Sequence, residues 1–196
     1  MTVPAPKQSS LSFRPAAPAD VPRLLPLIRS AYRGEASRKG WTTEADLVAD
    51  KRIDEAGLLA KIAEPEGVVL FVTDDAGASP PAMMSVTAAP LACCEIARVK
   101  TDPAVAYFGL FAVDPARQAG GVGRAVLAHA EAWARRAWGC ARMEMCVIWP
   151  RAELIAWYER RGYAKTGERR EFPYGELVDG GALRDDLWFE VLQKEL

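Results

Sequence analysis

A glycine-rich turn between an apolar strand and a long helix constrains this chain more than any other feature. The segment covers residues 107–138, and its turn reads QAGGVG over residues 118–123. Glycine lets the backbone adopt positive φ and approach a ligand closely. The first N–H groups of a helix have no partner within the helix, and the helix dipole adds partial positive charge there. The segment therefore predicts an anion site, most simply one for phosphate.

Two common phosphate-binding loops do not fit this turn. The dinucleotide fingerprint G-x-G-x-x-G needs glycine where the chain has Val126, and no acidic residue closes a second strand about twenty residues later. The ATP-binding loop G-x-x-x-x-G-K-[ST] needs lysine after its last glycine, but Arg124 and Ala125 follow Gly123. The pattern that does fit is Q-x-x-G-x-G directly before a helix.

The composition favours one globular domain and limits the partners. Of the 196 residues, 50% are hydrophobic and 26% are charged, which is enough to bury a substantial core. The net charge of −1, without a dense Lys/Arg stripe, argues against nucleic acid as a partner. Residues 1–13 lack the apolar core of a signal peptide, and no run approaches membrane-spanning length. We therefore expect no membrane partner and a cytoplasmic location.

The four cysteines fit a reducing compartment. Cys93 and Cys94 are adjacent, which disfavours a bridge between them, and no C-x-x-C pair occurs with Cys140 or Cys146. We expect buried free thiols. A single histidine leaves too few obvious ligands for zinc, so no metal site is predicted.

Hydrophobic periodicity predicts alternating helices and strands with no internal repeat or linker. After a flexible tail of residues 1–10, one domain is expected over residues 11–196. Strands are predicted at residues 11–15, 67–75, 81–90, 106–113, 142–148, 163–172 and 187–192. Helices are predicted at residues 21–33, 54–64, 122–138 and 151–161, and residues 95–100 fit either a strand or a loop. Long helices beside several strands indicate one α+β domain on a mixed sheet.

Polar and glycine residues mark several helix ends. Asp20 is expected to cap the first helix, and Gly139 to end the long one. A polar, flexible connection is predicted over residues 34–40. Thr42 or Thr43 is then expected to cap a further helix whose first turn carries acidic side chains.

The glycine turn resembles the acetyl-CoA motif [QR]-x-x-G-x-[GA] of the GCN5-related N-acetyltransferase (GNAT) family. A second stretch, WYERRGY at residues 157–163, resembles that family's second motif, in which an aromatic pair precedes a helix-ending glycine and another aromatic. The two motifs occur in the family's order and at a suitable distance. The resemblance implies a single, sandwich-like α+β acetyltransferase domain. Its central sheet is mixed and mostly antiparallel, with a splayed parallel strand pair flanked by helices.

The resemblance also implies acetyl-CoA as co-substrate, with no metal. Its pantetheine arm would bond to backbone groups of Leu110, Phe111 and Val113, which the splay of strands 106–113 and 142–148 leaves unpaired. Backbone N–H groups of the turn and helix start would hold the pyrophosphate: Gln118, Ala119, Gly120, Gly121, Val122, Gly123 and Arg124. The Arg124 side chain either contacts phosphate or faces solvent.

Tyr158 is the candidate catalytic acid. The implied reaction is direct attack of a primary amine on the thioester through a tetrahedral intermediate. In relatives with this motif the tyrosine hydroxyl lies near the cofactor sulfur, where a phenol of high pKa can protonate or hydrogen-bond the leaving thiolate. The alternative is a packed helix aromatic, which is our interpretation of the neighbouring Trp157.

The general base is harder to identify, because the chain departs from the family pattern. Many relatives carry glutamate on the strand before the glycine turn, where this chain has Tyr107. Glu95 is the candidate base, and another carboxylate of the first half or a water chain remains open. His129 is interpreted as structural. A second departure is Trp149-Pro150, where many relatives have an asparagine that bonds the pantetheine arm.

The acceptor is expected to be a small-molecule amine rather than a protein. Residues 32–44 and 172–175 mix aromatic and charged or flexible positions, and we expect them to wall an acceptor pocket. Homodimers are compatible with this fold. Transfer to a protein N-terminus or lysine remains open, and so does a catalytically degenerate sensor that only binds acyl-CoA. A covalent route through Cys93, Cys94 or Cys146 is disfavoured, because no activating His or Asp lies near them in sequence.

Overall fold

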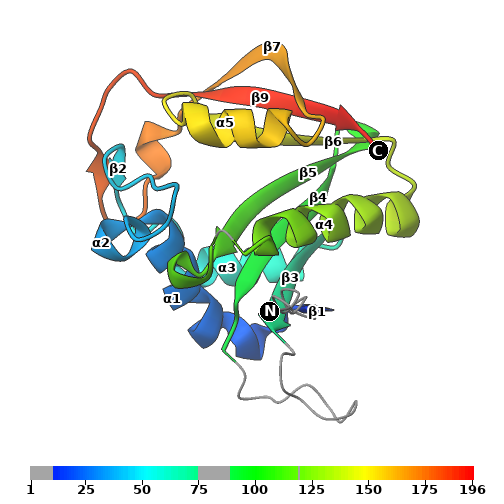
Figure 1. Cartoon of the computed structure of the whole chain (residues 1–196), viewed down its shortest axis with the longest axis horizontal. Coiled ribbons are helices and arrows are strands. Elements are labelled where there is room, and N and C mark those ends of the chain that lie inside the picture. Colours follow the sequence, from blue (N-terminus) through cyan, green and yellow to red (C-terminus); the bar gives the residue numbers. More distant parts are fainter. Residues whose placement is uncertain (1–10, 75–88, 119) are drawn as a thin grey trace, which may run out of the picture.

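A mixed sheet of seven strands runs through this computed structural model, which describes residues 11–74, 89–118 and 120–196 (Figure 1). Its order is β1-β3-β4-β5-β6-β9-β7. The strands are β1 (Leu11–Pro15), β3 (Gly67–Asp74), β4 (Ala92–Val99), β5 (Asp102–Val113), β6 (Arg142–Ile148), β7 (Ala164–Glu171) and β9 (Trp188–Glu195). Every neighbouring pair is antiparallel except β5 and β6, which are parallel. The predicted mixed, mostly antiparallel sheet is confirmed.

Helices lie on both faces of the sheet. They are α1 (Val21–Tyr32), α2 (Gly34–Ser37), α3 (Glu55–Ala63), α4 (Val122–Trp138) and α5 (Ala152–Glu159), with short 3-10 turns at Pro18–Asp20, Pro115–Arg117 and Tyr174–Glu176. A small second sheet pairs β2 (Val48–Ala49) with β8 (Gly181–Ala182). No helix of the described residues is long and apolar enough to cross a membrane.

Alternate residues of β3 show how the two layers of helices are held. Leu70 and Val72 belong to the core cluster that contains α4 and α5, whereas Val69 and Phe71 belong to the cluster that contains α1 and α3. Successive side chains of a strand point to opposite faces, so a strand buried on both faces is apolar throughout. This explains the unbroken run VVLFV at residues 68–72.

Several expected elements have the predicted bounds. β1, β6 and α4 begin and end at the predicted residues. Gly139 ends α4 in a left-handed conformation with φ of 66°, and its N–H donates to the Arg135 carbonyl at 3.1 Å. All four cysteines are free thiols; Cys146 is half-buried and the other three are buried.

The described sheet does not contain the hairpin expected from residues 67–90. The sheet neighbours of β3 are β1 and β4, and β4 includes residues 95–99 of the stretch 95–100 that fits either a strand or a loop. Residues 81–88 of the expected strand lie outside the described residues, as does the expected tail of residues 1–10. Ala89 and Pro90 are not part of a strand.

The expected helix after Thr42 or Thr43 is wrong. Residues 42–44 form a loop, followed by a turn and β2. The Thr43 hydroxyl oxygen accepts from the Ala45 N–H at 3.0 Å and bonds the Ser37 hydroxyl, so it closes this loop. The preceding connection is also more regular than expected, because α2 forms within it.

Asp20 occupies the N-cap position of α1 but does not cap it with its side chain. Its carboxylate instead accepts from both terminal nitrogens of Arg14, at 2.5 and 2.7 Å, and from Arg23. The nearly buried Asp20 therefore ties β1 to α1. The carboxylate binds the two guanidinium groups rather than the N–H groups of the helix start, because hydrogen bonds between charged groups are stronger.

Candidate active site

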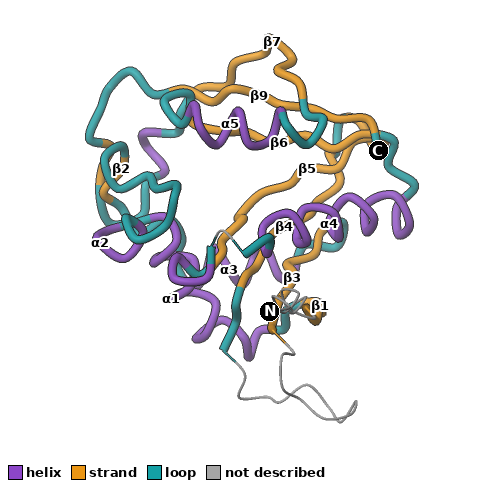
Figure 2. The backbone as a smooth tube through the Cα atoms, viewed as in Figure 1, coloured by secondary structure: helices purple, strands orange, loops and turns teal. Residues whose placement is uncertain are grey.

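The parallel pair β5 and β6 separates along its length. The strands pair only through Val105 with Arg142, Ala106 with Met143 and Tyr107 with Glu144. Beyond that point β5 stays beside β4 and β6 stays beside β9, and Figure 2 shows β5 bending away. Residues 107–111 of β5 and residues 145–148 of β6 line a cavity of about 400 Å³ in this opening. The expected splay is therefore present, and no strand of the described residues pairs with that edge of β5.

A bulge at Leu110 produces the bend. The β4–β5 register shifts between Cys93 and Glu95, and Leu110 has a φ of 46°. In a regular strand Phe108 and Leu110 would share a face, but Phe108 packs in the cluster with α4 and Leu110 in the cluster with α1. Positive φ costs a leucine about 1–2 kcal/mol, so the packing of its side chain must hold it. A bulge bends and twists a strand, which opens its far edge.

The glycine turn brings the start of α4 to one end of the cavity. Gly121 is the N-cap with φ of 83°, and no side chain of the described residues caps the helix there. A Cβ at Gly123 would lie 3.3 Å from Phe111 Cζ and 3.5 Å from the Trp157 ring, so glycine lets these aromatics approach the helix. Uncapped N–H groups at a helix start bind anions. Ala119, expected to contribute here, lies outside the described residues.

Two cations stand beside this helix start. Arg124 and Arg161 both line the cavity, and the Arg161 guanidinium lies 3.5 Å above the Trp157 ring. Burial, and then the nearby Arg160 and Arg124, lower the pKa of Arg161. The Arg161 Nε is buried and has no hydrogen-bond partner within the described residues. Like charges held together at a helix N-terminus favour an anion between them.

The Gln118 side chain ties the turn to the loop before β2. Its Nε2 donates to the Val113 carbonyl at 3.3 Å, and its Oε1 accepts from the Trp41 N–H at 3.1 Å. A Cβ at Gly40 would lie 2.5 Å from the same Oε1, so this close approach requires glycine. Gly40 and Trp41 are thus positioned against the cavity by a residue far along the chain.

Tyr158 lies on α5 and lines the cavity. Its side chain is only 4% exposed and packs edge-to-face on Trp157, at 5.0 Å between ring centroids. Burial, and then the neighbouring Tyr32, raise the pKa of its hydroxyl. That hydroxyl has no hydrogen-bond partner within the described residues. It is therefore a neutral phenol beside the cavity and can donate a proton or a hydrogen bond.

Glu95 lies behind the cavity wall rather than in it. It is 8% exposed, and Lys61 Nζ donates to its two carboxylate oxygens at 2.8 and 2.7 Å. A Cβ at Gly109 would lie 3.3 Å from Glu95 Oε2 and 2.5 Å from Tyr107 Cε1. Gly109 and Tyr107 line the cavity, so glycine lets the tyrosine ring and the Glu95 carboxylate both lie close to the backbone of β5.

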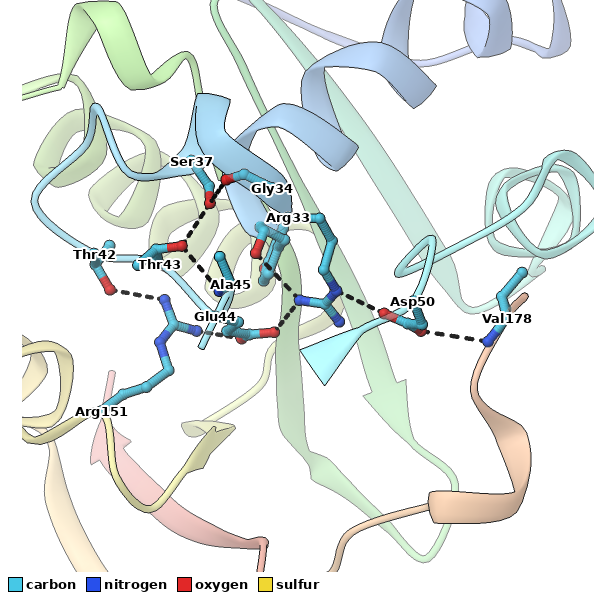
Figure 3. A network of polar contacts seen from close by, with 11 residues as sticks. Arg33, Gly34, Ser37, Thr42, Thr43, Glu44, Ala45, Asp50, Arg151 and Val178 are labelled. Carbon is cyan, nitrogen blue, oxygen red and sulfur yellow. Dashed lines mark hydrogen bonds and ion pairs between the residues drawn. The ribbon is translucent and has the colours of Figure 1, made fainter. Parts of the chain in front are cut away.

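An ion-pair network, drawn in Figure 3, lines the cavity at the expected acceptor wall of residues 32–44. Glu44, 5% exposed, accepts from Arg151 and, at 2.5 Å, from Arg33. Arg33 Nε also donates to Asp50 Oδ1 at 2.6 Å, and Arg151 Nη2 to the Thr42 hydroxyl at 2.8 Å. Burial alone would raise the pKa of Glu44, but Arg151, Arg33 and Arg52 outweigh it and lower the pKa. The network joins the end of α1, the loop before β2 and the start of α5.

The profile of the acetyltransferase (GNAT) family matches residues 32–163, more than half of the chain. The chain belongs to the GNAT family. A search of curated protein sequences finds no match to this GNAT chain.

Similar solved structures share the fold of this GNAT domain. PaiA N-acetyltransferase from Thermoplasma acidophilum, solved with coenzyme A, has a TM-score of 0.62 and 14% identity, over 95% of this chain and 99% of that one. The ribosomal-protein-S18-alanine N-acetyltransferase of Escherichia coli has a TM-score of 0.61 and 17% identity, over 95% and 94%. Spermidine N-acetyltransferase from Vibrio cholerae, solved with coenzyme A and spermine, has a TM-score of 0.63 and 14% identity, over 94% and 95%. Identities this low support the fold alone.

The structure brings most of the predicted site residues of this GNAT chain to one cavity. The following candidates line it: Leu110, Phe111, Val113, Gln118, Gly121, Gly123, Arg124 and Tyr158. Parts of both predicted walls line it too, namely Tyr32, Arg33, Trp41, Thr42 and Glu44 from the first and Phe172 and Pro173 from the second. Glu95 does not line it but lies next to Gly109, which does.

Three aromatic residues that the sequence did not assign to the site differ in their position relative to the cavity. Trp149 does not line the cavity; its indole Nε1 donates to the Asp186 carbonyl at 2.9 Å and its ring stacks on Trp188. His129 stacks on Phe13 at 3.9 Å, also away from the cavity, in agreement with a structural role. Trp157, interpreted as a packed aromatic, contributes to the cavity wall.

Sequence reasoning missed two charged side chains of the cavity, Arg52 and Arg151. Neither lies in a motif, whereas Arg33 and Glu44 fall within the predicted wall of residues 32–44. Their partners are distant in sequence, as Arg151 and Glu44 illustrate. The one usable signal was the concentration of charged and aromatic residues between Tyr32 and Arg52.

Proposed function

We propose that this protein transfers an acetyl group from acetyl-CoA to the primary amine of a small molecule, directly and without a covalent enzyme intermediate. The observation that carries the proposal is one cavity that runs from the uncapped start of α4 to the free hydroxyl of Tyr158. The four free thiols support a reducing cytoplasm as its compartment.

The residues fit acetyl-CoA in three respects. The α4 start, with Arg124 and Arg161 beside it, suits a pyrophosphate. The free edge of β5 from Phe108 to Val113 offers backbone groups to an extended amide-containing arm, as in strand addition. Glycine at 123 leaves room for the aromatic walls to close on such an arm.

Acetyl-CoA supplies a thioester whose carbon can bond to an amine nitrogen while the carbon–sulfur bond breaks. The Tyr158 hydroxyl would give a proton or a hydrogen bond to the departing sulfur. Desolvation keeps this phenol neutral, so the proton is present at physiological pH.

Glu95 would receive the proton that the attacking amine loses. It is close to Gly109 and Tyr107, so a water molecule beside them would connect the carboxylate to the cavity. Lys61 holds the carboxylate in place through two hydrogen bonds.

The size of the cavity favours a small acceptor over a protein. Its lining includes the apolar side chains of Phe172, Leu177 and Phe189, together with Trp41. A volume of about 400 Å³ lies within the usual range of small-molecule pockets.

Two substitutions with matched controls test this chemistry. Tyr158→Phe and Glu95→Gln should each lower kcat by about 10²- to 10⁴-fold with little change in coenzyme A affinity. Tyr163→Phe is the control for the first, because its hydroxyl bonds Glu131 away from the cavity. Glu131→Gln is the control for the second, because Lys194 holds Glu131 as Lys61 holds Glu95. The readout is thiol release from acetyl-CoA in the presence of an amine, with affinity by calorimetry. Unchanged kcat in either variant would remove that residue from the mechanism.

A further inference from the structure

Arg52 is held in an unusual backbone conformation at the acceptor end of the cavity. It lies between β2 and α3 with a φ of 63°, and the Ile53 N–H donates to the Lys51 carbonyl at 2.7 Å. A hydrogen bond between the first and third residues of a turn, with positive φ at the middle residue, defines the rare and strained form of the γ-turn. Burial of Ile53 and a bond from the Lys51 N–H to the Val178 carbonyl anchor both sides of it. Strain of this kind often accompanies a functional side chain.

The positively charged side chain of Arg52 lines the cavity and does not form an ion pair with a carboxylate of the described residues. Its guanidinium lies 4.9 Å from the centre of the Tyr32 ring and lines the cavity. Within the described residues it makes no hydrogen bond or ion pair. Burial alone would lower its pKa, but Tyr32, Glu44, Tyr107 and Asp50 raise it, so the group is charged.

The surrounding charges leave one positive charge over. Arg33 pairs with both Glu44 and Asp50, and Arg151 pairs with Glu44. The cluster therefore holds three guanidinium groups, those of Arg33, Arg151 and Arg52, but only two carboxylates, and most of it is buried. One more acidic side chain, Glu176, lines the cavity, but it is exposed at the rim, where water screens it.

The spare charge lines the same cavity as the proposed site of transfer. Tyr32, which lies against the Arg52 guanidinium, also lines this cavity, together with Tyr107 and Tyr158. A ligand that contacts both Arg52 and Tyr158 must therefore fit within a cavity of about 400 Å³, which suits a small molecule. The apolar side chains of Phe172, Leu177 and Phe189 line the same cavity and would accept an apolar substituent.

We propose that the acceptor is a small amino acid-like molecule whose oxyanion, a carboxylate or phosphonate, binds Arg52 while its amine faces Tyr158. This inference rests on the proposed acetyl transfer. A polycationic amine is disfavoured, because it would bring further positive charge to a site that already has one too many. Arginine suits this task because its planar donors match an oxyanion and stay charged when buried.

Matched acceptors that share one side chain test the proposal. L-phenylalanine, its carboxamide, phenethylamine and the aminophosphonate analogue are compared with spermidine by thiol release; leucine and its carboxamide form a second set. Wild type should favour the acid over the amide by at least about tenfold in kcat/KM, mostly through KM. Carboxylate and phosphonate probes distinguish the two oxyanions.

Variants at adjacent positions assign the preference to one side chain. Arg52→Gln should remove the preference by raising KM for the acid while leaving the amide unchanged, and Arg52→Lys should keep part of it. Lys51→Gln is the control, because this exposed lysine precedes Arg52 on the same loop, pairs with Asp179 of a different loop and does not line the cavity. A wild type that prefers the amide or spermidine, or an Arg52→Gln variant that slows all acceptors equally, would overturn the proposal.

A binding measurement separates this proposal from the proposed transfer. With coenzyme A at saturation, the acid but not the amide should raise the Tm of wild type, and neither should raise that of Arg52→Gln. This result without thiol release would disprove the transfer and keep the anion site. Thiol release with neutral amines but no stabilisation by any acid would keep the transfer and disprove the anion site.

Discussion

Glu44 shows how one side chain can set the shape of the acceptor end. Its carboxylate binds two guanidinium groups that come from α1 and from the start of α5. Removing one member of a buried ion pair leaves an unpaired charge, which is the costly situation. Glu44→Gln should therefore lower the free energy of unfolding by about 3 kcal/mol near pH 7. Glu66→Gln, which removes an exposed partner of Arg98, should cost less than about 1 kcal/mol.

The effect of Glu44 should depend on pH in a defined direction. The folded protein holds the pKa of Glu44 below its ordinary value, so its contribution is fully present above the pKa of the unfolded chain. That contribution is lost as pH falls through the folded-state pKa. Urea unfolding of wild type and Glu44→Gln should thus give a constant difference near neutrality that shrinks below about pH 4. A difference that grows on acidification would contradict the ion-pair account.

At the scale of elements, the two ends of α4 offer a direct comparison. Gly121 begins the helix with φ of 83° and Gly139 ends it with φ of 66°; a Cβ at Gly121 would meet only Arg124 Nη2, at 4.0 Å, and one at Gly139 nothing within 4 Å. Alanine at either position should cost about 1 kcal/mol through backbone strain. Only Gly121→Ala should also weaken coenzyme A binding, because only that end faces the cavity. Equal affinity of the two variants, measured by calorimetry, would exclude the α4 start as the pyrophosphate site.

The splay between β5 and β6 depends on an element that no motif identifies. Leu110 reverses the alternation of β5, and its side chain is held by the packing of α1. The periodicity of residues 106–113 predicted a strand, but it gave no sign of a bulge. A bulge depends on register with β4, which is a long-range property.

At the scale of the whole molecule, local signals predicted the second half of the chain better than the first. α4 and β6 follow from periodicity, and a helix-ending glycine marks the end of α4. The family resemblance correctly anticipated the sheet and the cavity between its parallel strands. In the first half, the polar residues from Thr42 to Asp50 were misjudged, because their partners lie at Arg33, Arg151 and Val178. Tertiary ion pairs there outweigh the local preference for a helix cap.

The most direct measurement of the central claim is thiol release from acetyl-CoA by the wild-type protein across a broad panel of amines. The panel includes amino acids, their carboxamides, polyamines and a lysine-containing peptide, with product masses recorded. The proposed function predicts release only when an amine is present, together with an equal amount of amine heavier by one acetyl group. Tight binding of acetyl-CoA without release for any amine would contradict it and would identify the protein as an acyl-CoA sensor.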